Sequence, residues 1–380
     1  MVEKFTSWYL WYYILLAFFG FIYVQQKNKY MASDEGKLLK SEDDYRVSLV
    51  FALLVFLPII LIVGFRDRWL ADTGAYTMMY ESWPSSLGEA LGDIDWNGKF
   101  PGFIVFSVII KQFFGSDYRI WLIIIALISG ICVAITYRRY APDVVTCAFL
   151  FFSSADYSSW MMNGMRQFLA AAVMFAVFPL VQKKKYILFI LIGLLMFTIH
   201  RSAILAIPLY IFALGKSFNK KTVIVLLLCI GAAAFANEFL GFMDDSLQGT
   251  AYNNLVSEFN DDGTNPLRVL VYAVPTIIAF LNRKKLDENT PEIINISINM
   301  SIISLGLFII SMFTSGIFMG RIPIFFSLFN YILLPWELKH FYNEDMHKTL
   351  QKIMVVMYII YYCISMSGVF TGTLPELPHD

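Results

Sequence analysis

The run IWLIIIALISGICVAIT, residues 120–136, decides what kind of fold this chain can adopt. It carries no charged residue, and the basic pair Arg138 and Arg139 follows it almost at once. An apolar run of roughly 17 to 25 residues is long enough to cross a lipid bilayer as a helix. The run therefore predicts a membrane-spanning helix with a positively charged end.

Similar runs recur along the whole chain. Its 380 residues are 58% hydrophobic and only 15% charged, whereas soluble domains are nearer half apolar and a quarter charged. Backbone groups inside a bilayer must be bonded within their own segment, which favours helices. We therefore expect an all-α, polytopic transmembrane protein in which residues 1–380 form a single integral membrane domain. About twelve spans are predicted, at 7–24, 46–64, 120–136, 143–160, 166–182, 186–200, 202–215, 222–239, 267–281, 293–311, 321–337 and 352–368.

Composition argues against several classes of protein. The chain has 29 basic and 29 acidic residues, so its formal net charge of +0 gives no reason to expect a nucleic-acid partner. The cysteines all fall in apolar runs without a CxxC or Cys/His cluster, which predicts neither a disulfide framework nor a metal site. We expect no cofactor. The cysteines are Cys132, Cys147, Cys229 and Cys363.

Four basic clusters orient the predicted spans. They lie at 138–139, 183–185, 216–221 and 283–285, and they fall on one side if each intervening run spans once. Cytoplasmic loops are enriched in Lys and Arg, so this side is expected to be the cytoplasmic one.

The short apolar stretch 100–114 leaves the orientation of its neighbours open. If it spans the bilayer, residues 65–100 lie in the cytoplasm; if it is a re-entrant or interfacial helix, they lie outside. A run of this length is more often interfacial or re-entrant. We therefore expect 65–100 and 240–266 to be outer-face loops.

The densest polar segment, GFRDRWLADTGAY, directly follows the predicted span 46–64. A charge at the centre of a membrane helix costs roughly 2.5 to 3.5 kcal/mol, so charges retained close to a span are candidates for function. Arg66, Asp67, Asp72 and Tyr76 together predict a polar site. The alternative is ordinary juxtamembrane charge that reaches the lipid headgroups.

Two further arginines stand at the start of apolar runs, Arg166 beside Gln167 and Arg321 beside Pro323. A cation at a helix N-terminus opposes the helix dipole and needs an anionic partner. A phosphate could supply it, since helix N–H groups and guanidinium both bind phosphate. With Arg66, these arginines predict a pyrophosphate clamp. The alternatives are snorkelling or a structural ion pair, for example between Arg166 and Asp156.

A general base would complete such a site. His200 lies between two apolar runs, and an unperturbed histidine titrates near neutral pH. Asp72 and Asp67 are the competing catalytic candidates on the same predicted face. Against this, a lone histidine at a helix junction is often only a structural hydrogen-bonding group.

These residues occur in segments that together resemble the EpsG family of Wzy-type polysaccharide polymerases. The resemblance covers residues 64 to 326, with the segments in the family's order. The family more often has a Gly-Thr-Asp-Tyr run where this chain has Asp72-Thr-Gly-Ala-Tyr76. The family also tends to have Glu before a Gly-Phe pair, where this chain has Asp95-Trp-Asn-Gly-Lys-Phe. The matching segments are GFRDRWLADTGAYTMMY, WNGKFPGF, MRQFLAAAVMF, IHRSAILAIP and GRIPIFF.

The resemblance implies a bacterial inner-membrane enzyme without a cofactor. Its partners would be the lipid bilayer and lipid-linked oligosaccharides, one serving as donor on undecaprenyl pyrophosphate and one as acceptor; a chain-length regulator protein is a further expected partner. Two rival interpretations stay open, a flippase or transporter for lipid-linked glycan and a membrane acyltransferase with His200 as base. Transporters often show internal repeats, and none is evident in this sequence.

Overall fold

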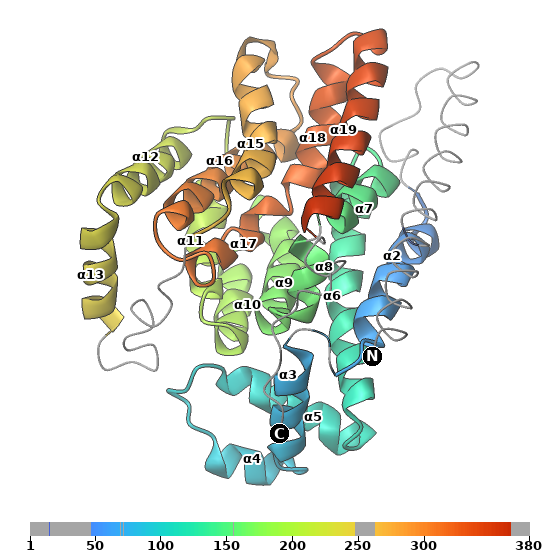
Figure 1. The fold of residues 1–380 in the computed structure, drawn as a ribbon, viewed down its shortest axis with the longest axis vertical. Coiled ribbons are helices and arrows are strands. Elements are labelled where there is room, and N and C mark those ends of the chain that lie inside the picture. The colour runs from blue at the N-terminus through green and yellow to red at the C-terminus, as the bar shows by residue number, and fades with distance from the viewer. Residues whose placement is uncertain are drawn as a thin grey trace.

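The computed structural model describes Leu15 and residues 47–68, 70, 72–154, 156–247 and 263–365. Within these ranges all regular structure is helical (Figure 1), as the apolar runs predict. The predicted span 7–24 lies outside the described residues except for Leu15. The elements are α2 (Leu49–Gly64), α3 (Thr73–Ser82), α4 (Leu87–Asp93), α5 (Pro101–Phe114), α6 (Tyr118–Tyr140), α7 (Val144–Ser153), α8 (Asp156–Met162), α9 (Met165–Gln182), α10 (Tyr186–Ile199), α11 (Ala203–Phe212), α12 (Lys220–Ala234), α13 (Ala236–Leu247), α15 (Pro266–Leu281), η2 (Arg283–Lys285), α16 (Glu292–Met312), η3 (Met319–Arg321), α17 (Ile324–Ser327), α18 (Asn330–His340) and α19 (Glu344–Ser365).

In the described part of the chain, three helices, α6, α9 and α16, are long and apolar enough to cross a membrane. A fourth span results if α12 and α13 count as one, although a bend of 101° separates them. The remaining apolar helices are shorter than a full span. The structure therefore supports a membrane-type helical protein, while the predicted number of about twelve spans stays a prediction.

Polar side chains begin many of these helices. Ser48 accepts a hydrogen bond from the backbone of Phe51 at the start of α2, and Asp117 accepts one from Arg119 at the start of α6. Such N-caps satisfy backbone N–H groups that have no partner inside the helix. Local sequence thus determines at which residue these helices begin.

Besides 222–239, which divides at the bend between α12 and α13, two further predicted spans are broken. The segment 143–160 divides into α7 and α8 after Ser153 and Ser154, whose hydroxyls donate to the carbonyls of Phe149 and Phe151. Serine hydroxyls that bond to nearby backbone compete with regular helix. The segment 321–337 becomes η3, α17 and α18.

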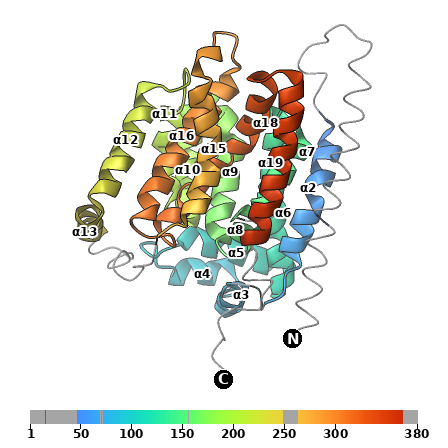
Figure 2. The ribbon, with the colours of Figure 1, turned by 45° about the horizontal axis from the view of Figure 1, so that its top comes forward.

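The helices pack around an aromatic core and leave apolar side chains on the outside. Phe175, Phe178 and Tyr210 contact Phe329 edge to face. Such contacts add to burial of apolar area. On the outer side, α12 and α19 run along the bundle (Figure 2), and both of them, as well as α10, carry exposed leucine, isoleucine or valine side chains. This surface suits a hydrocarbon environment.

One end of the bundle gathers the basic clusters. Arg138 Nε donates to the carbonyl of Val47 at 2.9 Å, which joins the end of α6 to the start of α2. The hydroxyl of Tyr140 donates to Gln182, so the end of α9 also lies here, followed by the lysines at 183–185.

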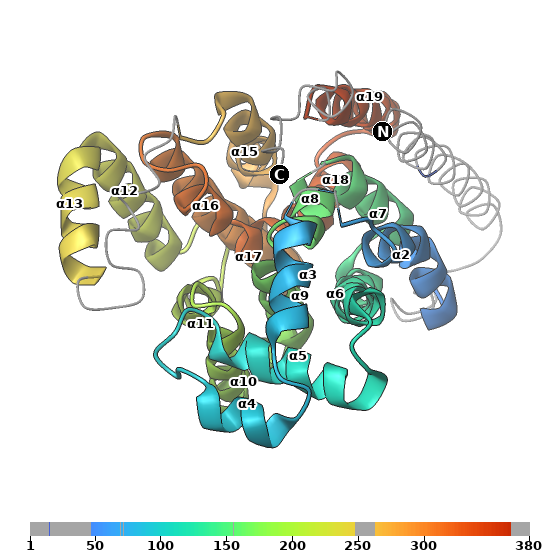
Figure 3. The ribbon, with the colours of Figure 1, turned by 60° about the horizontal axis from the view of Figure 1, so that its bottom comes forward.

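The segment from α3 to α5 covers the opposite end. In Figures 1 and 3 these three helices lie together beyond the ends of the longer ones, with α3 in front of α9 in Figure 3. A Cβ on Gly102 of α5 would lie 1.9 Å from Thr198 Oγ1 near the end of α10. At the other side, Trp121 Nε1 near the start of α6 donates to Ser107 of α5 at 3.0 Å. Because α5 contacts the ends of two other helices, it runs across this end of the bundle.

Candidate functional site

The polar junctions predicted from the sequence meet beneath this covering layer. Arg66 is 3% exposed, and its guanidinium donates to three described residues. Its Nη1 donates to the carbonyl of Val63 at 2.7 Å, its Nε to Thr73 Oγ1 at 2.9 Å, and its Nη2 to Met165 Sδ at 3.0 Å. Arg66 therefore fixes the start of α3 against the first residue of α9.

Arg166, the next residue along α9, is bound in a different way. Its Cζ lies 3.9 Å from the centroid of the Phe100 ring and 5.3 Å from that of Tyr76. Aromatic faces attract a guanidinium but accept few hydrogen bonds. Its Nε and Nη1 are buried, and no described residue accepts a hydrogen bond from them. Unpaired buried donors of this kind call for an explanation, and a ligand with anionic oxygens would provide one.

The predicted structural partner of Arg166 is engaged elsewhere. Asp156 forms an ion pair with Arg268, at 3.2 Å between Oδ2 and Nε, and accepts a hydrogen bond from Tyr361 at 3.2 Å. The structure thus does not support the alternative in which Arg166 pairs with Asp156.

Gln167 joins three separate segments. Its Nε2 donates to Ser202 Oγ at 3.1 Å and to the backbone carbonyl of Arg321 at 3.0 Å. His200 Nδ1 lies 2.7 Å from the same Ser202 hydroxyl. One amide therefore brings the start of α9, the connection between α10 and α11, and η3 together at one place.

His200 lies in that connection, outside both helices, and is half-buried. Burial, and after it the positive charges of Arg166 and Arg321, lower the pKa of His200 to about 3. Both effects disfavour the charged imidazolium. The ring is therefore neutral at physiological pH and lies within the electrostatic field of both arginines.

Arg321 is half-buried, and its Cζ lies 5.3 Å from the centroid of the Trp160 ring. Among the residues that the structure describes, none receives a hydrogen bond or ion pair from its guanidinium. Of the three predicted clamp residues, Arg166 and Arg321 thus keep donors for a ligand. The donors of Arg66 are already used within the protein.

The predicted carboxylates lie at the edge of this cluster. Asp72 occupies the N-cap position of α3, is exposed, and makes no side-chain capping bond. Its backbone N–H donates to Asn163 Oδ1 at 3.2 Å, which places it near the start of α9. Asp67 is half-buried in the preceding turn, and Tyr76 is buried under Arg166.

Sequence reasoning missed Arg268. It stands at the start of α15, just as Arg166 opens α9, and its Cζ lies 5.7 Å from the Trp160 ring. The pattern Asn265-Pro266-Leu267-Arg268 is the signal that could have identified it. Trp160 is thus bordered by the guanidinium groups of Arg268 and Arg321.

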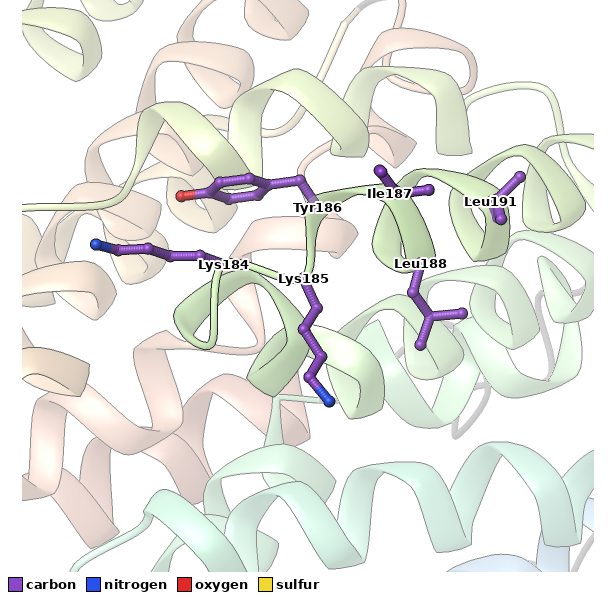
Figure 4. A pocket seen from close by; sticks show the side chains of 6 residues that line it. All are labelled: Lys184, Lys185, Tyr186, Ile187, Leu188 and Leu191. Carbon is purple, nitrogen blue, oxygen red and sulfur yellow. The ribbon is translucent and has the colours of Figure 1, made fainter.

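A shallow, open hollow of about 330 Å³ lies on the opposite, basic end (Figure 4). Lys184, Lys185 and Tyr186 line it together with apolar residues from the start of α10. It contains none of the predicted site residues. We place the candidate site at the arginine junctions instead, because buried unpaired donors occur there.

The described ranges contain no group of three or more His, Cys, Asp or Glu side chains arranged to hold a metal ion. The chemistry present is that of guanidinium groups, one neutral imidazole, amide and carboxylate. Such a set can bind a phosphate or pyrophosphate and accept a proton.

Comparison with known proteins gives one clear result. No curated protein and no solved structure matches the chain. The model of the EpsG family, whose members are Wzy-like polysaccharide polymerases, matches residues 49–375, which includes every residue of the candidate site. The apolar helices agree with a membrane protein of this kind. The chain belongs to the EpsG family.

Proposed function

We propose that this protein is a polysaccharide polymerase that joins oligosaccharide repeats carried on undecaprenyl pyrophosphate. It would act at the outer face of the bacterial inner membrane, with about twelve spans and with residues 65–100 and 240–266 outside. Family membership supports the general activity. One observation supports a pyrophosphate-linked donor: the buried Nε and Nη1 of Arg166 have no hydrogen-bond acceptor among the described residues.

The donor pyrophosphate would bind between Arg166 and Arg321. Guanidinium presents parallel donors that match phosphate oxygens. The start of α9 adds to this site, because its N-cap Gly164 leaves the first N–H groups without a side-chain cap. Uncapped helix N-termini bind anions. The neutral state of His200 avoids a further positive charge that would have to be desolvated.

In the proposed reaction, a hydroxyl oxygen of the acceptor sugar attacks the anomeric carbon of the donor. A new glycosidic C–O bond forms while the bond from that carbon to the pyrophosphate oxygen breaks. The electron pair leaves with the lipid pyrophosphate, whose charge the two arginines stabilise. The proton of the hydroxyl passes to a base, and no oxidant, metal or nucleotide is consumed.

His200 is suited to receive that proton. Burial is the first cause of its lowered pKa, and the charges of Arg166 and Arg321 lower it further; a pyrophosphate bound between the arginines would offset the second effect. Donor binding would therefore raise the basicity of the imidazole when it is needed. Asp72 and Asp67 stay alternative bases, and Asp72 is exposed enough to approach a substrate.

Polymerisation by the purified full-length protein, supplied with its lipid-linked repeat, tests the proposal. Replacing Arg166 or Arg321 by Lys removes the bidentate geometry, and losing one charge-assisted hydrogen bond costs about 1.5 to 3 kcal/mol, or roughly 10- to 100-fold in rate. Arg68→Lys is the matched control, because Arg68 already pairs with Glu81 and stacks on Tyr118.

Three results would contradict the proposal. Full-length polymer from both Arg166→Lys and Arg321→Lys would remove the pyrophosphate clamp. Translocation of lipid-linked glycan without chain growth would identify a flippase instead. Transfer of an acyl group would identify an acyltransferase.

The orientation has its own test. Cysteines introduced at the exposed positions Ser85 and Ser246 should both react with a membrane-impermeant reagent added from outside. Protection of position 85 alone would mean that α5 crosses the membrane.

A further inference from the structure

A second polar cluster lies beside the arginines, formed by residues from three distant helices. Asp156 opens α8, Arg268 belongs to the first turn of α15, and Tyr361 lies near the end of α19. Asp156 Oδ2 lies 3.2 Å from Arg268 Nε and accepts a hydrogen bond from the Tyr361 hydroxyl at 3.2 Å. The side chains of Arg268 and Asp156 are 21% and 17% exposed, so the pair is neither sealed nor freely solvated.

Each member of the pair keeps unused bonding capacity. Asp156 Oδ1 and the two Nη atoms of Arg268 make no hydrogen bond to any residue in the described part of the chain, although both side chains are partly accessible. A largely buried ion pair is a weak source of net stability, because desolvation offsets the attraction. The pair therefore has both the exposure and the free atoms that a ligand would use.

Trp160 joins this cluster to the proposed pyrophosphate site. Its ring centroid lies 5.3 Å from Arg321 Cζ and 5.7 Å from Arg268 Cζ. A Cβ on Gly164 would lie 2.5 Å from Trp160 Cε3, so only glycine permits this packing at the N-cap of α9. The indole is therefore packed against the N-cap of α9 and lies close to both guanidinium groups.

The backbone around η3 and the start of α15 is packed equally closely. A Cβ on Gly320 would lie 2.4 Å from Thr264 Oγ1, and the hydroxyl of Ser311 donates to the same atom at 2.7 Å. This contact brings the residue before Arg321 against the segment that leads into Arg268. The two polar clusters are thus held as neighbours by backbone packing.

The two polar clusters differ in net charge, so they are expected to bind different chemical groups. Arg166 and Arg321, with neutral His200, form a cluster of net positive charge that favours an anion. Asp156 with Arg268 has no net charge and offers both an acceptor and donors. Sugar hydroxyl groups both donate and accept hydrogen bonds, and an aromatic side chain provides an apolar face with a polar edge. A neutral sugar matches this second cluster better than a second pyrophosphate does.

We propose that Asp156, Arg268 and Trp160 form the binding site for the acceptor sugar, separate from the pyrophosphate site at Arg166 and Arg321. The proposal rests on the polymerase function argued above. Asp156 Oδ1 accepts a hydrogen bond from a hydroxyl of the terminal acceptor sugar, and the Nη groups of Arg268 donate to its oxygens. Tyr361 holds the carboxylate in place from the other side.

The test uses the full-length protein in detergent with two separately supplied substrates. The donor is the lipid-pyrophosphate-linked repeat, and the acceptor is the same repeat oligosaccharide cleaved from its lipid and fluorescently labelled. Direct binding of the labelled oligosaccharide and its extension by one repeat are both measured. Asp156→Asn should weaken oligosaccharide binding and raise the acceptor KM by roughly 10-fold or more, since a charged hydrogen bond is lost, while the affinity for the donor is unchanged.

Matched variants separate binding from structure. Glu81→Gln removes the carboxylate of another Arg–carboxylate pair, Arg68–Glu81, and should leave the acceptor KM unchanged. Tyr361→Phe should raise it less than Asp156→Asn does, because it removes only one supporting bond. Arg166→Lys should show the opposite pattern, with weaker donor binding and unchanged oligosaccharide binding.

Two outcomes would overturn the acceptor site. One is absence of oligosaccharide binding by the wild-type protein; the other is an equal affinity in wild type and Asp156→Asn. Loss of donor and acceptor binding together, with a lowered melting temperature, would assign the pair a structural role and also overturn the proposal. Binding of the oligosaccharide without any extension would instead contradict the polymerase function and leave the acceptor site in place.

Discussion

The two ends of the helical bundle hold their cations in different ways. At the basic end, Arg138 donates to the carbonyl of Val47, and Arg283 Nη1 donates to that of Phe280 at 3.0 Å. At the other end, Arg166 and Arg321 lie over aromatic rings, and no described residue accepts a hydrogen bond from their guanidinium groups. Cations at helix C-termini satisfy free carbonyls and stabilise the fold. Cations that keep their donors free are available for a ligand.

Arg66 and Arg166 show the same contrast within a single site. Arg66 is fully buried and uses three donors on residues of the protein, one of them Met165. Its neighbour Arg166 has two buried nitrogens without an acceptor in the described ranges. We therefore propose that Arg66 stabilises the fold and that Arg166 binds the ligand, and substitutions should separate these two roles.

The largest expected effect on stability follows from this pair. Arg66→Met should destabilise the folded protein by about 2 to 4 kcal/mol, because several hydrogen bonds from a charged group are lost and their acceptors stay buried. Arg166→Met should change stability less, since it removes contacts with aromatic rings but no hydrogen bond to the described chain. Melting temperatures of both variants in the same detergent make the comparison. Equal destabilisation would show that Arg166 is also structural.

His200 makes the stability of the folded protein depend on pH. Its pKa is lowered to about 3 in the folded protein, first by burial and then by Arg166 and Arg321, whereas an unfolded histidine titrates near 6.5. Between these values the unfolded chain binds more protons, so stability must fall as pH decreases from about 6.5 toward 3.

His200→Asn removes this contribution of the imidazole to stability. It should therefore make the melting temperature less dependent on pH between about 6.5 and 3. The carboxylates titrate in both proteins, so the difference between the two curves is the quantity to measure. Parallel curves would mean that His200 is not held neutral by its surroundings.

A smaller effect is expected at the basic end. Lys184 has a φ of 57°, and the N–H groups of Lys184 and Lys185 donate to the carbonyls of Val181 and Leu180. This is a Schellman motif at the end of α9, where glycine is usual. Lys184→Gly should therefore stabilise the protein, by up to about 1 kcal/mol. Chemical denaturation of purified protein would measure it, and a loss of stability would show that the lysine side chain itself holds the turn.

Much of the helical architecture could be predicted from the sequence, because long uncharged runs form α6, α9 and α16 within a few residues of the expected bounds. The breaks were harder to predict. The segment 143–160 contains enough apolar residues for a span, yet the hydroxyls of Ser153 and Ser154 bond to the preceding turn and end α7. Likewise the bend between α12 and α13 follows a change from an apolar to an amphipathic helix, which hydropathy alone does not register.

The candidate site was predictable where one residue breaks an apolar pattern. Arg166, His200 and Arg321 stand out in this way, and the structure brings them together through Gln167. Pairing between distant segments was not predictable. The sequence suggests Asp156 only as a partner for Arg166, whereas three-dimensional packing places Arg268 beside it.

The central claim, that Arg166 and Arg321 hold the donor pyrophosphate, is tested most directly by binding. Affinity for a lipid pyrophosphate without sugar is measured on purified wild type, Arg166→Lys, Arg321→Lys and the control Arg68→Lys. We expect Arg166→Lys and Arg321→Lys each to bind roughly 10- to 100-fold more weakly, from the loss of about 1.5 to 3 kcal/mol in one charge-assisted hydrogen bond, and Arg68→Lys to bind like wild type. Equal affinity in all four proteins would contradict it.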